Sequence, residues 1–296
     1  MTRLDLALVR LHPELSRRKA REVIEKGQVS VGGQTLLAAG APVAPDAEIR
    51  WDPNRKARSR VRLSLPLLYA DERILIVDKP AGLLSVPRHE GSHEDSVLER
   101  VREYVRRVRP RRPYVGAVHR LDRETSGALA VALDPAARAA MRALFRDHRI
   151  ERTYVALAVG TPRADQGVVD EPIRDAYRGG RRGVARPGEK AREAVTRWRV
   201  RERLGAVSRL EVDLATGRQH QIRAHLAHVG LPILGDGVYG RGTPAGIPAS
   251  RQMLHAARLG FVHPLTQARV AVESPLPDDF RRLLARLRRQ AGSHLG

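Results

Sequence analysis

A polar, basic segment after Asp52 constrains the fold most, because it divides the chain into two unequal units. It reads Asp-Pro-Asn-Arg-Lys-Ala-Arg-Ser-Arg, with a proline near its start and no apolar periodicity. Such a composition is typical of a linker rather than of a helix or a strand. We therefore predict a small domain at residues 1–51, a basic linker at 52–65, a large domain at 66–290 and a disordered tail at 291–296.

The small unit is predicted to fold as helix, helix and hairpin. Leucines at helical spacing indicate a first helix that ends before Pro13. A second helix is expected over residues 17–26, with Ser16 as its N-terminal cap and Gly27 as its stop. Two alternating valines followed by Gly32-Gly33 then indicate a β-hairpin.

The second helix of the small unit presents a basic surface. Arg17, Arg18 and Arg21 lie close together on a helix and could contact phosphates. A solvated basic helix without a partner is the alternative interpretation. The order of helix and hairpin around these arginines favours an RNA-binding module.

The charge of the whole chain points to a polyanionic partner. The formal net charge is +21, from 54 Lys and Arg against 33 Asp and Glu. Nucleic acid is the first candidate, because Lys and Arg that neutralise phosphates release counterions. A membrane is disfavoured, since no apolar run approaches the roughly 20 residues of a spanning helix and the first residues lack the apolar core of a signal peptide. Zero cysteines exclude disulfides and thiolate metal sites and fit a reducing compartment, so we expect a cytoplasmic protein.

The large unit alternates between apolar strands and amphipathic helices. A short apolar run at residues 74–77 is suited to a buried strand. Further strands are predicted at 128–133 and 151–160 and in a hairpin around 198–214, and helices at 96–108, 135–148, 218–229 and from 281 onward. Neither an internal repeat nor a nucleotide-binding glycine motif is present.

An acid between two arginines stands out at Asp122, within the sequence Val-His-Arg-Leu-Asp-Arg-Glu-Thr-Ser-Gly of residues 118–127. The positive charges of Arg120 and Arg123 favour its ionised form. Thr-Ser-Gly suits a tight turn, which would place the acid in the loop before the strand at 128–133. There it could act as a nucleophile or a base. A surface ion pair without a chemical role is the competing interpretation.

This segment resembles the active-site signature of the RluA-type pseudouridine synthases, and further motifs of that family follow along the chain. They are the strand and Lys-Pro-x-Gly turn of 68–82, Arg-Thr-Tyr at 152–154, Gly-Arg-Gln-His-Gln-Ile-Arg at 217–223, Leu-Pro-Ile-Leu-Gly-Asp at 231–236, Leu-His-Ala at 254–256 and His-Pro at 263–264. Arg152 and Gln219 depart from the usual Lys and the usual Thr or Ser. The small unit resembles an RNA-binding domain of the ribosomal-protein-S-four type, which is often fused to such enzymes.

The resemblance implies a fold and a reaction. The fold would be α+β, with a mixed, mainly antiparallel central sheet and flanking helices. The reaction would be the isomerisation of uridine to pseudouridine within RNA, without a cofactor. Asp122 would be the essential carboxylate, Arg223 its ion-pair partner and Tyr154 the ring that packs against the flipped base. Leu254 and Ile233 are expected to form the apolar wall of the pocket.

The same resemblance implies RNA as the partner. Ribosomal RNA, most often of the large subunit, is the first candidate, and transfer RNA is the alternative. Arg120 is expected to fill the gap left by the extruded base or to contact phosphate, whereas His119 is expected to be structural. A monomer is the default expectation.

Two other classes of function stay open. A non-catalytic RNA-binding or ribosome-assembly protein could keep this fold without turnover. A nucleoside or glycoside hydrolase would need a second carboxylate across the bond, for which Glu124 is the nearest candidate. The spacing of His220, His225 and His228 does not bring three imidazoles together on a helix, so we predict no metal site.

Overall fold

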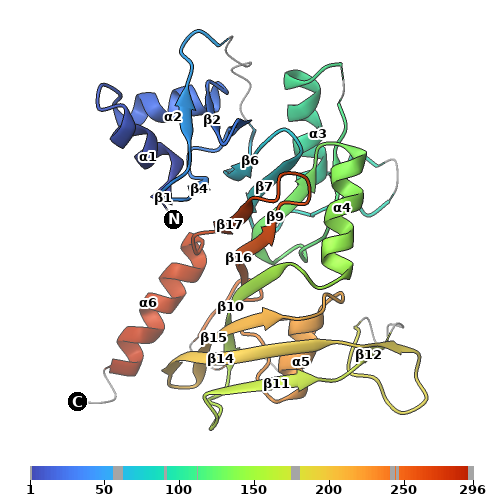
Figure 1. The fold of residues 1–296 in the computed structure, drawn as a ribbon. Helices are drawn as coiled ribbons and strands as arrows, with labels where there is room; N and C mark the ends of the chain where they lie inside the picture. The colour runs from blue at the N-terminus through green and yellow to red at the C-terminus, as the bar shows by residue number, and fades with distance from the viewer. Residues whose placement is uncertain are drawn as a thin grey trace.

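A ten-stranded sheet forms the centre of the protein, and a small N-terminal unit packs against one end of it (Figure 1). The computed structural model describes residues 2–55, 63–89, 92–111, 113–174, 181–240, 244 and 247–292. Across these ranges no helix is both long and apolar enough to span a membrane. The predicted class, α+β with a mixed and mainly antiparallel sheet, is confirmed.

The N-terminal unit has the predicted order of two helices and a hairpin. The Ser16 hydroxyl accepts a hydrogen bond from the Lys19 backbone N–H at 3.2 Å, so it caps the second helix as predicted. Ala20, Val23 and Ile24 of that helix are buried. The elements are β1 (Thr2–Arg3), α1 (Leu4–Leu11), α2 (Arg17–Glu25), β2 (Val29–Val31), β3 (Gln34–Thr35), β4 (Pro42–Val43) and β5 (Ile49–Trp51). The last of these, which the sequence did not predict, pairs with β2 and completes a three-stranded sheet.

The large sheet has the strand order β11-β14-β15-β10-β16-β9-β7-β6, with β17 beside β16 and β8 beside β9. Its strands are β6 (Leu67–Ala70), β7 (Ile74–Lys79), β8 (Gly116–Ala117), β9 (Ser126–Ala132), β10 (Glu151–Val159), β11 (Gln166–Asp170), β14 (Val195–Leu204), β15 (Val207–Leu214), β16 (Leu254–Val262) and β17 (Arg269–Glu273). A separate small pair consists of β12 (Ile173–Arg174) and β13 (Ala191–Arg192). Within the large sheet β16 and β9 run parallel, which brings the first residues of both strands to the same edge.

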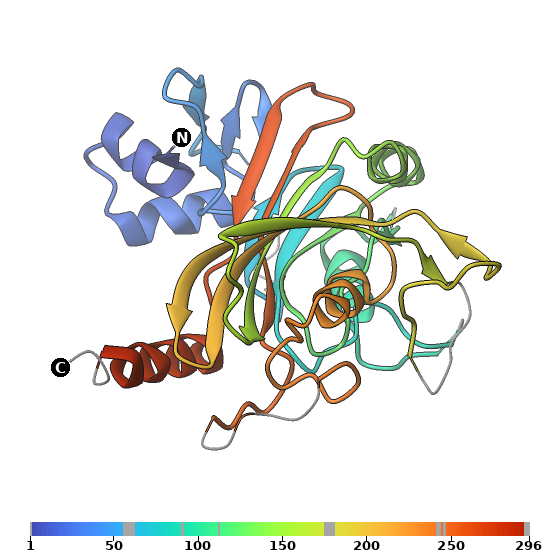
Figure 2. The same ribbon diagram turned by 90° about the horizontal axis from the view of Figure 1, so that it is seen from below.

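Local capping explains where two helices of the large unit begin. The Ser96 hydroxyl accepts a hydrogen bond from the Glu99 N–H at the start of α3 (Val97–Val108). Asp134 does the same for α4 (Pro135–Arg146), which begins with a proline already suited to the first helical turn. The remaining helices are α5 (Gln221–His228) and α6 (Asp278–Gly292), and α6 packs beside the β14–β15 hairpin (Figure 2).

Gly127 allows the parallel strands to approach closely. A side-chain carbon at this position would lie 2.2 Å from the backbone oxygen of Ala256 in β16, and the residue has φ +118°. Every residue of β9 is buried. The glycine that ends the Thr-Ser-Gly sequence is therefore needed for the contact between the two central strands.

Three predicted boundaries differ from the structure. Helix α5 begins at Gln221 rather than at residue 218, because His220 has left-handed backbone angles of φ 59° and ψ 16°. Helix α6 begins at Asp278 and extends to Gly292, so the first two residues of the predicted disordered tail are helical. Residues 293–296 of that tail and residues 56–62 of the predicted linker lie outside the described residues. The end of the linker is packed, since Leu65 is buried in the core of the large unit.

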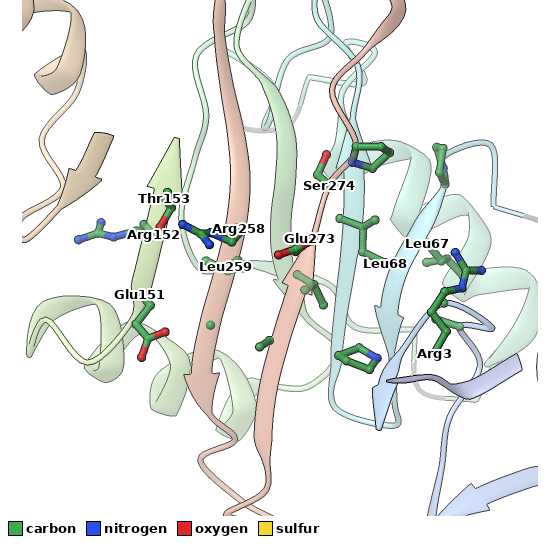
Figure 3. Close-up of a pocket in the computed structure, with 18 of the residues that line it drawn as sticks. Arg3, Leu67, Leu68, Glu151, Arg152, Thr153, Arg258, Leu259, Glu273 and Ser274 are labelled. Atoms are coloured by element: carbon green, nitrogen blue, oxygen red, sulfur yellow. The ribbon is translucent and has the colours of Figure 1, made fainter. Parts of the chain in front are cut away.

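The small unit contacts the large sheet directly. The backbone N–H of Leu37 donates to the carbonyl oxygen of Ala70 at 3.1 Å, and both units contribute to one hydrophobic cluster. A groove of about 1450 Å³ lies between them. Figure 3 shows Arg3 on the N-terminal side of this groove and Arg152 and Arg258 on the side of the sheet.

Candidate active site

Segments that are far apart in the sequence meet at the edge where β9 and β16 begin. Asp122 lies in the loop just before β9, and Leu254 is the first residue of β16. Tyr154 of the neighbouring strand β10 pairs with Ala256, and the start of α5 brings Arg223 to the same place. A cleft of about 890 Å³ opens over them. This volume is in the range of sites that bind small molecules.

Arg223 is held between two carboxylates. Its Nη1 donates to Asp122 Oδ2 at 2.9 Å, while its Nε and Nη2 donate to the two oxygens of Asp236 at 2.6 and 2.9 Å. Asp236 is fully buried, whereas the Asp122 side chain keeps 22% of its surface exposed. The bidentate pair with Asp236 fixes the plane of the guanidinium, which leaves one edge for Asp122.

The charges of this triad stabilise one another. Burial alone would raise the pKa of Asp236, but hydrogen bonds from Arg223 and from the backbone of Val238 and Tyr239 hold it below its usual value. Burial lowers the pKa of Arg223, yet the two carboxylates more than offset this and raise it. Arg223 is therefore a permanent cation beside Asp122.

The two arginines next to Asp122 in the sequence lie elsewhere. Arg123 donates to the carbonyl oxygen of Gly82 at 2.9 Å, and its Nε is 3.8 Å from Glu124. Arg120 is exposed at the rim of the cleft, and within the described part of the chain it has no hydrogen bond or ion pair. Tertiary contact, rather than sequence proximity, supplies the cation that meets Asp122.

The predicted aromatic and apolar residues have different positions. Tyr154 and Leu254 both line the cleft and are buried except for a small surface. Ile233 is placed differently. Its backbone forms a bridge with Ala158 of β10, and its side chain lies in the same hydrophobic cluster as Tyr154 and Leu254, so its place in the pocket wall stays a prediction.

The histidines near the cleft occupy separate environments. The Nε2 of His119 accepts the Ala130 N–H at 2.9 Å and its ring stacks on Phe145, and burial lowers its pKa to about 3, which fits the structural role predicted for it. His220 lies 3.8 Å from Asp122. His225 is buried against Thr196 and the Glu171 carbonyl, while His228 is exposed.

Two buried cations hold the loop that carries Asp122. The Lys79 ammonium donates to the carbonyl oxygens of Pro80, Leu83 and Arg123. Burial lowers the pKa of Lys79 to about 7, so these three acceptors favour a charge that its surroundings otherwise disfavour. On the other side, Arg251 donates to the carbonyl oxygen of Glu124 and pairs with Asp279 of α6.

Comparison with known families shows which family the chain belongs to. A family model described as RNA pseudouridylate synthase matches residues 73–228, the span that contains Asp122, Tyr154 and Arg223. A model of the S4 domain matches residues 2–49. The chain belongs to the RNA pseudouridylate synthase family. This synthase is an isomerase that acts on RNA, as the motifs predicted, and its small unit is an S4 domain.

Relatives resemble this synthase along nearly its full length. Ribosomal large subunit pseudouridine synthase D of Pseudomonas aeruginosa is 35% identical over 314 residues, which cover 99% of this chain and 94% of the relative. An uncharacterised RNA pseudouridine synthase of Synechocystis is 34% identical over 301 residues, with 97% and 90% covered. A solved structure, human RNA pseudouridylate synthase domain containing 4, has a TM-score of 0.63 at 25% identity and covers 75% of this chain and 92% of its own.

The S4 domain of the synthase has a second charged cluster. Asp5 is fully buried and accepts hydrogen bonds from Arg3, Arg17 and Arg21 at 2.9 to 3.2 Å. We expected Arg17 and Arg21 to be free for phosphates, but both are tied to this carboxylate. Their side chains remain about half exposed, as does that of Arg3, and Arg18 is exposed beside them.

Sequence reasoning missed four residues that build the site of this synthase: Lys79, Asp236, Tyr239 and Arg251. Asp236 could have been found, because it is an acid that ends an apolar stretch just after Gly235. Tyr239 follows in the same turn, and its ring lies 5.0 Å from the Arg223 guanidinium carbon. Neither Lys79 nor Arg251 carries a local signal of its contacts with a loop remote in the sequence.

Proposed function

We propose that this synthase converts uridine to pseudouridine in large-subunit ribosomal RNA. The observation that carries the proposal is the pairing of Asp122 with the buried Arg223 in a cleft of suitable size for a nucleotide base. Relatives named as large-subunit ribosomal pseudouridine synthases, similar over almost the whole chain, support the choice of RNA.

The target base leaves its stack to enter the cleft. A uridine within structured RNA is covered by its neighbours, so its glycosidic bond is accessible to a side chain only after extrusion. Tyr154 supports the extruded ring on one side and Leu254 contributes apolar surface. Arg120, exposed at the rim, fills the space that the base leaves or contacts a phosphate.

Asp122 supplies the essential carboxylate. Arg223 holds its Oδ2, so Oδ1 is the oxygen directed to the reacting nucleotide. In the reaction the bond between ribose carbon 1 and uracil N1 breaks, the uracil turns, and its carbon 5 joins carbon 1 of the ribose. The proton on carbon 5 leaves and N1 gains one, so the product is an isomer of the substrate. A cleft that excludes water protects the detached uracil from escape.

The S4 domain adds affinity for RNA. Arg17, Arg18 and Arg21 contact phosphates, which carry no sequence information but position the RNA over the cleft. We also propose that the synthase acts as a monomer. We propose the cytoplasm as its compartment, and a sequence without cysteine fits a reducing environment.

Mapping of pseudouridine tests this proposal. Unmodified ribosomal and transfer RNA are incubated with wild type or with Asp122→Asn, treated with carbodiimide and read by primer extension. We expect new stops in large-subunit ribosomal RNA with wild type alone, while the RNA affinity of Asp122→Asn stays within about threefold of wild type.

Other outcomes would separate the alternatives. Stops in transfer RNA only would change the substrate. Tight binding by both proteins without stops would favour an assembly factor, and release of free uracil would favour a hydrolase. Full activity of Asp122→Asn would remove the proposed role of the carboxylate.

A further inference from the structure

His220 has a backbone conformation that its residue type does not favour. Its φ of 59° and ψ of 16° lie in the left-handed region. Among the described residues two other non-glycine residues have positive φ, His148 and Gln267, and both are exposed, whereas the His220 side chain is mostly buried and lines the cleft. Side chains other than glycine in this region carry a steric cost, and such residues concentrate at functional sites.

Helix capping does not explain why a histidine occupies position 220. His220 occupies the N-terminal cap position of α5, but its side chain makes no capping hydrogen bond. Asn, Asp, Ser and Gly serve this position better, and Asn and Gly also tolerate the left-handed backbone. The left-handed backbone at position 220 would suit Asn or Gly better than His. Neither capping nor backbone preference therefore accounts for the imidazole in the cleft.

Both ring nitrogens of His220 face groups of the site. Nδ1 is 3.1 Å from the hydroxyl of Tyr239, and Nε2 is 3.8 Å from Oδ1 of Asp122. The second distance exceeds that of a hydrogen bond, so the imidazole and the carboxylate border the same space without being locked together. Oδ1 is also the oxygen that Arg223 leaves to the substrate.

The surrounding charges determine the protonation of the ring. Burial is the main effect that lowers the pKa of His220, and the cations Arg223 and Arg182 lower it further against the opposing effect of Asp122 and Asp236. The ring is therefore neutral at pH 7. Because the Tyr239 hydroxyl can donate to Nδ1 and the carboxylate attracts an N–H, the single proton belongs on Nε2.

We propose that His220 is a further catalytic residue, whose Nε2–H donates a hydrogen bond to the uracil as its bond to ribose breaks. This role rests on the proposed function. When the bond breaks, its electron pair goes to the uracil, and the negative charge is shared by N1 and the carbonyl oxygen on carbon 2. A fixed neutral donor beside the ribose stabilises that charge without giving up its proton. Tyr239 orients the donor.

The test removes the imidazole without adding backbone strain. His220→Gly suits a φ of 59°, and His220→Asn tolerates it while keeping a shorter N–H donor. His228→Ala is the matched control, because His228 is exposed on the same helix. Single-turnover rates of glycosidic-bond cleavage are measured on a large-subunit ribosomal RNA fragment that carries uridine or 5-fluorouridine at the mapped position. Cleavage is the step compared, because 5-fluorouridine has no proton on carbon 5 to lose and does not complete the conversion. Fluorine makes the uracil anion less basic and thus a better leaving group.

We expect His220→Gly to slow glycosidic-bond cleavage of uridine by about 10- to 100-fold, with RNA affinity within about threefold of wild type. The defect should be several times smaller with 5-fluorouridine, and imidazole in the buffer should restore part of the rate. The rate of His220→Asn should lie between those of His220→Gly and wild type, and the rate of His228→Ala should equal that of wild type.

Two results would overturn the proposal for His220: no slowing of either variant, or the same slowing on both substrates, which is the pattern of a structural role. If His220→Gly folds poorly, the comparison of the two substrates is made with His220→Asn. A wild-type protein that forms no pseudouridine in ribosomal or transfer RNA would instead overturn the proposed function.

Discussion

The two charged clusters of this synthase are built in opposite ways. At the candidate active site one buried cation, Arg223, lies between two carboxylates, of which Asp122 reaches the cleft. In the S4 domain one buried carboxylate, Asp5, is surrounded by three arginines that are about half exposed. The first cluster has a formal charge of −1 (one Arg, two Asp) and the second +2 (three Arg, one Asp).

The difference shows which groups of a charged cluster are buried and which are exposed. In each cluster the fully buried carboxylate orients the cationic groups, and the group that reaches solvent is the one for which we propose a function. A single carboxylate for covalent or acid–base chemistry needs one fixed partner in a cleft. Phosphates along an RNA need several outward cations, and a buried acid limits their mutual repulsion.

Removal of Arg223 should have the largest effect. Arg223→Met leaves Asp236 buried without its cation, so we expect the free energy of unfolding to fall by about 3–5 kcal/mol and pseudouridine formation to fall by at least about 10²-fold. Urea denaturation and single-turnover rates measure the two effects. The control Arg258→Met removes an exposed arginine that pairs with Glu211, and it should cost under about 1 kcal/mol. Equal losses in both variants would contradict the special contribution of the buried cation Arg223.

Neutralising Asp236 should change the response to acid. The pKa of Asp236 is lower in the folded state than in the unfolded state, where it is near 3.8. The ionised carboxylate therefore adds fully to the free energy of unfolding above pH 3.8, and this contribution is lost as pH falls through the folded-state pKa. Asp236→Asn should lower the free energy of unfolding by about 2 kcal/mol at neutral pH. Below about pH 4 the stability of this variant should decline less steeply than that of wild type. Urea midpoints from neutral to acidic pH test this. Parallel curves for the two proteins would refute the stabilising role of the ionised carboxylate.

Neutralising Asp5 in the S4 domain should lower the free energy of unfolding less than neutralising Asp236. Burial raises the pKa of Asp5, but hydrogen bonds from Arg3, Arg21 and Arg17 more than offset this and hold it below the usual value. Because those arginines are half exposed and screened by water, Asp5→Asn should cost only about 1 kcal/mol. Thermal melts and RNA binding measure the result, with affinity expected within about threefold of wild type. A loss as large as that of Asp236→Asn would show that the comparison is wrong.

Truncation of one S4-domain arginine should have the smallest effect on stability and a defined effect on binding. Arg21→Ala should reduce the slope of log affinity against log salt by about 0.9 for a duplex contact, while turnover of bound RNA is unchanged. Arg50→Ala, which removes an exposed arginine paired with Glu48, is the control. An unchanged slope for Arg21→Ala would remove this residue from the RNA surface.

Sequence patterns determined the local structure and the identity of the candidate site. Ser16 capped its helix as predicted, the glycine pair at 32–33 turned the hairpin, and the motif around Asp122 pointed to the family. These features depend on a few neighbouring residues, so the sequence contains them directly. Tyr154 and Arg223 were also predicted as site residues, because they lie in motifs that resemble those of a known family.

Only the tertiary structure decided which side chains are partners. Arg223 meets Asp122 from 101 positions away, while Arg120 and Arg123, adjacent in the sequence, lie elsewhere. Asp236 joins the pair, whereas Ile233 in the same motif lies in the hydrophobic core. Sequence spacing fixes neither the direction of a side chain nor the packing that buries it. Those follow from the contact of β9 with β16 and from the placement of α5, which the whole chain determines.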